Sequence, residues 1–160
     1  DHRDLHSFPT RRSSDLIASA VSSGATGNSG GIVLSTNNLE VLNGAQLDTS
    51  TFGDGNAGQV QIEATGDVRV DGPNTGIVSQ VGLGARGDSG GIVLSANNLS
   101  VLNDAVLSAG TLGAGNAGRI AITAIGDVLV DADAVIDSSV LPGGTGNSDG
   151  IVLSDRKSVV

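Results

Sequence analysis

The chain has 160 residues, with 25 glycines, no cysteine and a formal net charge of −9. The absence of cysteine excludes disulfides and thiolate metal sites. Basic and aromatic residues are scarce, so the chain lacks phosphate-binding patches and stacking platforms, and we expect no nucleic-acid partner. No apolar run approaches the roughly 18 residues of a membrane span, so we expect no membrane insertion.

The two ends of the chain differ in character from the rest. Residues 1–16, DHRDLHSFPTRRSSDL, and residues 155–160, DRKSVV, resemble translated DNA-sequencing adapter. We therefore expect neither segment to belong to the fold, which leaves residues 17–154. This interior region has no histidine, because His2 and His6 lie in the first segment. It keeps three of the eight basic residues and thirteen of the seventeen acidic ones.

Residues 17–154 repeat with a period of 60. The stretch GATGNSGGIVLSTNNLEVLNGAQLDTS (24–50) aligns with GARGDSGGIVLSANNLSVLNDAVLSAG (84–110), and a third copy begins at GTGNSDGIVLS (144–154). Within each 60-residue unit the pattern occurs a second time in weaker form, as in GNAGQVQIEA (55–64), which corresponds to GNSGGIVLS (27–35). The structural unit is therefore about 30 residues long. A fixed period of this size is typical of repeat architectures such as solenoids.

The apolar residues of each unit predict three short strands. They alternate with polar or small residues, the period of two that is typical of strands with one buried face. The inward positions of the first strand are Ile32/Leu34, Val60/Ile62, Ile92/Leu94, Ile120/Ile122 and Ile151/Leu153. Those of the second strand are Leu39/Val41, Val68/Val70, Leu99/Val101 and Val128/Val130. The third strand is expected at residues 17–21, 45–49, 77–81, 105–109 and 136–140. Three such strands, separated by Gly, Asn and Asp turns, cannot close a core alone.

Stacking of the units solves this problem. If each unit is one coil of a parallel β-helix, every strand pairs with its equivalent one coil above and below, and like residues form inward ladders. At the corners we expect one column of side chains to satisfy turn amides in successive coils: Asn28, Asn56, Asp88, Asn116 and Asn147. A second set is expected to hydrogen-bond along its own ladder: Ser19, Ser79 and Ser138. Disorder is the alternative, and strand periodicity kept in register over four units argues against it.

Two functional signatures overlap in ARGDSGGIVLS (85–95). The segment GDSGG resembles the surroundings of a serine-protease nucleophile, but Ser29 and Ser148 occupy the same repeat position as Ser89, and the interior region offers neither histidine nor lysine as a base. We therefore expect no protease. The tripeptide Arg86, Gly87, Asp88 matches an integrin-type receptor motif, and a coil corner would expose it. A solvated turn in one substituted repeat is the competing interpretation.

Three acids, Asp131, Asp133 and Asp137, break the repeat, because the corresponding stretch one unit earlier reads Asp-Gly-Pro-Asn (71–74). Clustered carboxylates serve calcium binding or acid/base chemistry in carbohydrate-active enzymes with β-helix folds. A solvated loop is the competing explanation. GGTGNSDGI (143–151) resembles a calcium-binding nonapeptide, but Asp149 lies one place late and the period is near 30. We expect no catalytic residue, no metal site and no cofactor.

The order of motifs carries a family resemblance over essentially all of residues 17–154. G-N-x-G-x-(I/V)-x-(I/L), then N-N-L-x-V-L-N-x-A and T-x-G-x-G-N-A-G, is similar to the repeats of filamentous haemagglutinin-like exoproteins of two-partner secretion, especially the cyanobacterial ones. The resemblance implies an extracellular right-handed parallel β-helix, exported unfolded through an outer-membrane β-barrel transporter and used for attachment to a host-cell or surface glycan receptor. The family's N-terminal secretion domain is absent from this sequence, which would then come from the repetitive shaft.

The sequence therefore predicts an all-β, right-handed parallel β-helix of about four coils, with three short strands per coil and a length of roughly 20 Å at the usual strand spacing. The expected role is a non-catalytic shaft segment of a secreted or cell-surface adhesin-like exoprotein. The alternative is a fragment of a carbohydrate-active lyase or hydrolase. Uncapped ends would expose strand edges, so a fragment of this kind is expected to self-associate.

Overall fold

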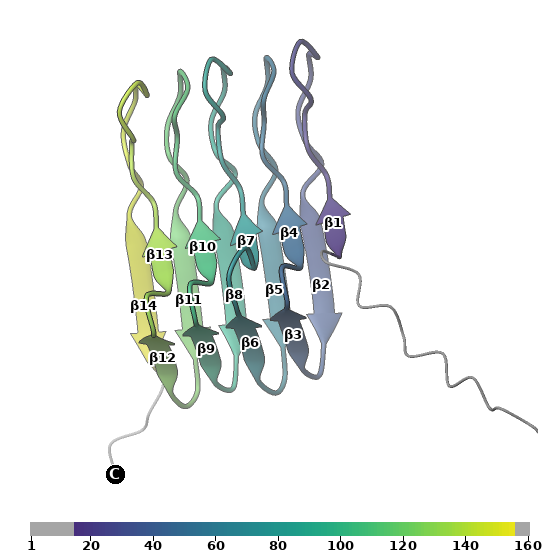
Figure 1. The fold of residues 1–160 in the computed structure, drawn as a ribbon, viewed down its shortest axis with the longest axis vertical. Helices are drawn as coiled ribbons and strands as arrows, with labels where there is room; N and C mark the ends of the chain where they lie inside the picture. Colours follow the sequence, from purple (N-terminus) through teal and green to yellow (C-terminus); the bar gives the residue numbers. More distant parts are fainter. Residues whose placement is uncertain (1–14, 156–160) are drawn as a thin grey trace, which may run out of the picture.

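The computed structural model describes residues 15–155, and this part of the chain forms fourteen β-strands and no helix (Figure 1). The strands are β1 (Leu16–Ala18), β2 (Ile32–Thr36), β3 (Leu39–Leu42), β4 (Gln46–Asp48), β5 (Val60–Ala64), β6 (Val68–Asp71), β7 (Gly76–Val78), β8 (Ile92–Ala96), β9 (Leu99–Leu102), β10 (Val106–Ser108), β11 (Ile120–Ala124), β12 (Val128–Asp131), β13 (Val135–Asp137) and β14 (Ile151–Asp155). Among the described residues no helix is long and apolar enough to cross a membrane.

The strands stack into three parallel sheets, which confirms the predicted parallel β-helix. The sheets have the orders β1-β4-β7-β10-β13, β14-β11-β8-β5-β2 and β12-β9-β6-β3, so each strand pairs with its equivalent in the next coil. Four complete coils of three strands lie between β1 and β14 (Figure 1). The register is that of the sequence repeat, because Val60 pairs with both Ile32 and Ile92, and Ile120 pairs with Ile92 and Ile151.

The core is a set of aliphatic ladders between the sheets. The inward residues that the alternation predicts in the central coils are almost wholly inaccessible: Val60, Ile62, Val68, Val70, Ile92, Leu94, Leu99, Val101, Ile120 and Ile122. A parallel pair places like residues directly above one another, so Ile, Leu and Val of neighbouring coils pack together. Burial of apolar area at roughly 25 cal/mol per Å² is the main favourable term in the stability of such a core.

After the strand in the sheet β1-β4-β7-β10-β13 each coil continues into a narrow arm, and the arms stack on one another (Figure 1). Isolated parallel bridges link Thr51 to Val21 and Val81, and Arg86 to Asp54 and Ala114. The predicted third strand is thus shorter as a regular strand than expected, although its ladder hydrogen bonds continue. The Ser79 amide donates to the Ser108 carbonyl at 2.8 Å, for example.

Glycine allows the arms of neighbouring coils to lie close together. At Gly115, where φ is +150°, a Cβ atom would lie 2.6 Å from the Gly87 carbonyl carbon and closer still to its oxygen. No side chain fits in that space, and L-residues rarely adopt that φ. The repeated glycines of the sequence are therefore needed where one arm stacks on the next.

The arm interior contains one buried hydroxyl without a partner among the described residues, the Oγ1 of Thr51. Valine occupies the equivalent position in alternate coils, at Val21, Val81 and Val140. Because valine has nearly the same shape and no hydroxyl to desolvate, we expect Thr51→Val to stabilise the fold by about 1 kcal/mol. Thr111→Val is the matched control, since the Thr111 hydroxyl accepts from the Gly113 amide at 3.3 Å. Urea denaturation followed by circular dichroism measures both, and an equal gain in the two variants would contradict this explanation.

The two terminal segments expected to lie outside the fold contribute one residue each to the strands. Leu16 begins β1 and Asp155 ends β14. Asp15 precedes β1 and its carbonyl accepts from the Gln46 amide at 2.8 Å, and residues 1–14 and 156–160 lie outside the described residues.

Candidate functional site

A continuous column of amide and carboxylate side chains runs along one corner of the arms, as predicted. The Asn28 side chain accepts from the Asn56 amide at 2.8 Å, and Asn56 accepts in the same way from Asp88 at 2.8 Å. Asp88 accepts from Asn116 at 2.7 Å and Asn116 from Asn147 at 2.9 Å. Each side chain therefore satisfies a backbone amide of the next coil, and the column joins five coils.

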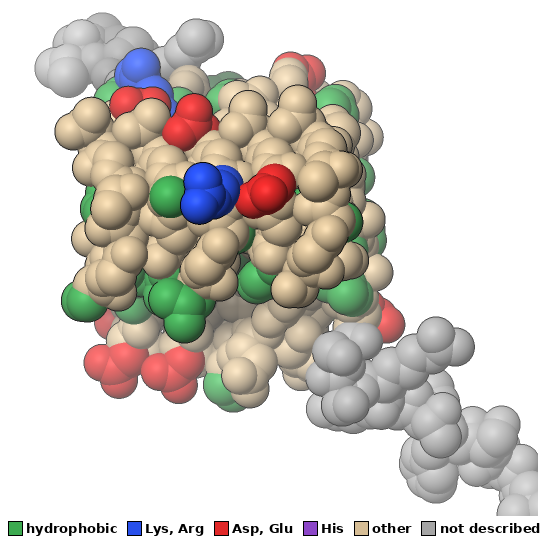
Figure 2. All heavy atoms as spheres, turned by 90° about the horizontal axis from the view of Figure 1, so that it is seen from above, with side chains coloured by type: hydrophobic (Ala, Val, Ile, Leu, Met, Phe, Trp, Pro, Cys, Tyr) green, Lys and Arg blue, Asp and Glu red, His purple; other side chains and the backbone are tan. Residues whose placement is uncertain are grey.

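The receptor-like tripeptide lies within this column. The Arg86 and Asp88 side chains are exposed, but their backbone belongs to the ladder between arms: the Arg86 amide donates to the Gly53 carbonyl at 3.0 Å, and the Gly87 amide donates to Ala114 at 2.9 Å. The Asp88 carboxylate also accepts from the side-chain amide of Asn116 at 3.0 Å. The tripeptide is therefore displayed along a straight, stacked edge. Figure 2, viewed from the arm end, shows a surface of mostly uncharged atoms with few acidic or basic side chains.

Ser89, the residue in the nucleophile position of the protease-like segment, has a structural role. Its hydroxyl donates to the Ser79 carbonyl and lies 3.2 Å from the Ser79 hydroxyl, and it accepts from the Gly91 amide at 3.2 Å. The Ser148 hydroxyl makes the equivalent contacts with Ser138. The hydroxyls thus hold the two legs of one arm together.

The expectation that Ser19, Ser79 and Ser138 bond along their own ladder was wrong. The Ser79 hydroxyl donates to the Gly58 carbonyl of the preceding arm at 2.8 Å, and Ser138 donates to Gly118, also in the preceding arm, at 2.6 Å. The reason is spacing, because the serines lie two coils apart and Ala109, which has no hydroxyl, follows Ser79 in this column.

The three acids that break the repeat do not form a cluster. Asp131 ends β12, Asp133 lies in the following turn and Asp137 ends β13. The Asp131 carboxylate accepts from the Ala132 amide at 2.7 Å, and the Asp137 carboxylate accepts from the Ser139 hydroxyl. Within residues 15–155 the structure brings no three histidine, cysteine or acidic side chains into a group that could hold a metal ion.

The break in the repeat is a change of turn. Ala132 and Asp133 have φ values of 53° and 61°, which match 53° and 63° at Asn103 and Asp104 one coil earlier. In both turns the third residue donates back across the turn, as Ala134 does to Asp131 at 3.3 Å. The fourth coil therefore uses the turn of the first and third coils, and only the second coil has the longer turn with Pro73. The segment is regular in structure although it is irregular in the 60-residue alignment.

Ala132 holds a left-handed conformation that alanine adopts at a cost of about 1–2 kcal/mol. Asn43 and Asn103 hold the same position in other coils. Because asparagine tolerates this conformation better, we expect Ala132→Asn to raise the free energy of unfolding by about 1 kcal/mol, measured by urea denaturation. Ala114→Asn, on an exposed arm position whose φ is not positive, should give no gain. A loss of stability in Ala132→Asn would contradict the explanation that the left-handed backbone at residue 132 destabilises alanine more than asparagine.

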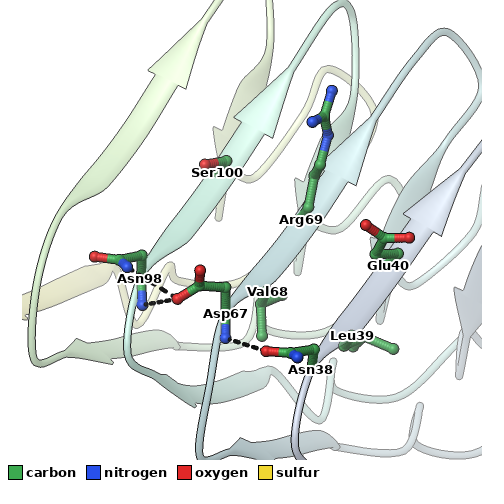
Figure 3. Close-up of a pocket in the computed structure, with 8 residues that line it drawn as sticks. All are labelled: Asn38, Leu39, Glu40, Asp67, Val68, Arg69, Asn98 and Ser100. Carbon is green, nitrogen blue, oxygen red and sulfur yellow. Dashed lines mark hydrogen bonds between the residues drawn. The ribbon is translucent and has the colours of Figure 1, made fainter.

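A groove lies on the sheet β12-β9-β6-β3, and sequence reasoning missed it. It is lined by Asn38, Leu39, Glu40, Asp67, Val68, Arg69, Asn98 and Ser100 (Figure 3). One wall is a second ladder of polar side chains, in which Asn38 accepts from the Asp67 amide at 2.8 Å and Asp67 accepts from the Asn98 side chain at 2.9 Å. The signal was present in the sequence, because Asn-Asn-Leu and Gly-Asp alternate at the 30-residue spacing (37–39, 66–67, 97–99, 126–127).

Arg69, which lines the groove, forms an ion pair with Asp71 in which the Arg69 side chain is half-exposed. The Asp71 carboxylate also accepts from the Asn103 side chain at 2.7 Å. The hydrogen bond from Arg69 and then that from Asn103 lower the pKa of Asp71 below its ordinary 3.8, and the hydrogen bond to Asp71 raises the pKa of Arg69. In Figure 3 Arg69 points away from Asp67, and its charge interacts instead with that of Glu40 on the neighbouring strand.

The lowered pKa of Asp71 predicts a small pH dependence of stability. A carboxyl whose pKa is lower in the folded state stabilises the fold fully above its unfolded pKa, and this contribution is lost as the pH falls through the folded pKa. We therefore expect the stability difference between the native chain and Asp71→Asn to shrink as the pH falls from about 5 to below 3. The Arg69 side chain is half-exposed, so solvent screens the pair and the effect is small. Denaturation at several pH values measures it, and a pH-independent difference would contradict it.

Comparison with protein-family models, with curated proteins and with solved structures finds no match.

Proposed function

We propose that this chain is a segment of a rigid shaft without catalytic function, which holds another part of a larger protein at a distance. The observation that supports this proposal is continuity. The same three ladders, the same arm and the same two polar columns run from coil to coil, and the segment at 131–137 adopts a turn used elsewhere in the stack. An enzyme needs a place where its structure departs from the repeat.

A pulling experiment tests the shaft. A chain held at its two ends is expected to resist extension and then to unfold in steps of about one coil, each releasing roughly 100 Å for 30 residues. Central coils are held on both sides, so the outer coils should open first. Smooth extension without steps, as a flexible chain gives, would overturn the proposal.

The secreted or cell-surface location, the outer-membrane β-barrel transporter and the glycan receptor belong to this proposal through the resemblance of the repeats. Asp88→Asn tests whether Arg86-Gly87-Asp88 contributes to attachment. Asparagine stands in the same column at Asn28, Asn56 and Asn116, so the fold is expected to be unchanged. Loss of cell attachment in Asp88→Asn with unchanged stability would assign a receptor role to the motif. Unchanged attachment would show that Asp88 has only a structural role in the column.

The carbohydrate-active alternative is favoured by one observation, the groove in which Glu40 and Asp67 present carboxylates. It predicts that acidic polysaccharides are depolymerised and that Glu40→Gln or Asp67→Asn abolishes the reaction. Incubation of the chain with acidic polysaccharides, with and without calcium, gives the answer. Released oligosaccharides that disappear in any of these variants would replace the shaft with an enzyme.

A further inference from the structure

The broad side of the solenoid formed by β14-β11-β8-β5-β2 carries an exposed apolar row. We call it the valine face, meaning the outward side of these five strands with Val33, Val93 and Val152. These valines are 71%, 36% and 39% exposed, and they recur every second coil at equivalent positions of β2, β8 and β14. Contiguous exposed apolar surface is typical of interaction sites, and here Ala121 joins Val93 to Val152 while the longer Gln61 lies between Val33 and Val93.

The valine face is also the part of this acidic chain that another acidic chain can approach. Glu63 is the only charged residue at the outward positions of these five strands, and its carboxylate accepts from the Gln61 side chain at 2.9 Å. The opposite side carries Glu40, Asp67 and Asp131 on or beside its sheet. A chain with net charge −9 repels its own copies least where its acids are absent.

We propose that the valine face binds the valine face of a second copy, with the two solenoids side by side and their axes antiparallel. A two-fold axis along β8, the central strand of the sheet, places Val93 against Val93 of the second copy. It also places Val33 against Val152, the larger Gln61 against Ala121, and Glu63 against Thr123. Isologous pairing of this kind is self-complementary, and it avoids contact between the two Glu63 carboxylates. With the axis along the solenoid instead, Gln61 would face Gln61 and Ala121 would face Ala121.

The area of the valine face sets the strength of this contact. Five strands about 4.8 Å apart and five residues long cover roughly 400 Å² per copy, or about 800 Å² in total. Stable interfaces bury about 1,200 Å² or more. The pair is therefore weak in this chain and gains about 160 Å² with every coil that a longer stack adds. The contact between two valine faces does not depend on the proposed function. A role for this contact in bundling shafts does rest on it.

Cysteine cross-linking tests the proposal with the full chain, because the native sequence has no cysteine. Val93→Cys is expected to form a disulfide-linked dimer under mild oxidation at least tenfold faster than Ser100→Cys, the control on the outward side of β9 in the same coil. Head-to-tail stacking would keep Val93 residues of neighbouring copies about 20 Å or more apart, so it cannot produce this result. Equal rates for the two variants would overturn the lateral contact.

A mixed experiment tests the antiparallel order. Gln61→Cys and Ala121→Cys chains are expected to cross-link with each other faster than either does with itself, whereas head-to-tail stacking would keep these two positions of neighbouring copies about 14 Å apart. Preferential cross-linking of Gln61→Cys with itself would overturn the two-fold along β8. Val93→Lys provides an independent reading in a Leu153→Lys chain, in which the end contact is weakened, since it should abolish the remaining dimers seen by sedimentation equilibrium while Ser100→Lys leaves them. A chain that is monomeric in every variant but still unfolds coil by coil would overturn the lateral contact and leave the shaft.

Discussion

Gly115→Ala is expected to lower the free energy of unfolding by about 3–5 kcal/mol. Two costs add at this position. The new Cβ atom would lie 2.6 Å from the Gly87 carbonyl carbon of the preceding arm, and relief of that overlap requires the arms to separate, at about 1–3 kcal/mol. The φ of +150° costs a non-glycine residue another 1–3 kcal/mol. Urea denaturation followed by circular dichroism measures the change.

Gly84→Ala is the matched control. Gly84 lies at the tip of an arm with φ +77°, and nothing lies within 4 Å of its added Cβ. This variant should therefore lose only the conformational term, about 1 kcal/mol. The difference between the two variants isolates the close contact between stacked arms, and equal losses would show that arm contact does not contribute to stability.

Ile92→Ala is expected to lower the free energy of unfolding by about 3–4 kcal/mol. Ile92 is wholly buried in β8 and pairs with Val60 on one side and Ile120 on the other. The cavity is enclosed by ladders above and below, so the surroundings cannot collapse into it, and the loss includes a cavity term as well as the lost transfer free energy. In a stack whose stability is the sum of contacts between neighbouring coils, the substitution weakens two interfaces at once.

Ile151→Ala, in the same ladder, provides the comparison. Ile151 lies in β14 and is 46% exposed, and only one coil packs against it within the described residues. We expect it to lose about 1 kcal/mol. If the two variants lost equal amounts, the central coils would not be held more tightly than the outer ones, and stepwise unfolding from the outer coils would also be wrong.

We expect copies of the chain to associate through the exposed ends of the stack. The inward residues Ile151 and Leu153 are half-exposed, whereas Ile120 and Ile122 of the preceding coil are buried. Strand edges with such surface add further strands of the same kind. Light scattering of the described part of the chain should show oligomers that Leu153→Lys reduces. Because Val93→Cys cross-linking does not depend on Leu153, end contact and lateral contact can be separated.

The ladders of the fold were predictable from the sequence alone. The alternation of apolar residues defined the first two strands of each coil, and the 60-residue repeat with its 30-residue echo gave their register. Inward and outward positions are fixed by a period of two, and stacking of identical units leaves only one way to bury them. The Asn28-to-Asn147 column followed in the same way, since equivalent turn residues must lie above one another in a solenoid.

The sequence did not predict the arm, the groove or the hydrogen-bond partner of each polar side chain, because these depend on the tertiary structure. Sequence periodicity says that Ser79 faces inward but not that the preceding arm brings the Gly58 carbonyl within 2.8 Å. It marks residues 131–137 as irregular, whereas the turn they form recurs elsewhere in the stack, because different residues adopt the same left-handed backbone. Hydrogen-bond partners are chosen by distances between segments that are far apart along the chain, and only the folded chain sets those distances. The repeat determined the ladders, and the packing of one leg on another decided what each side chain does.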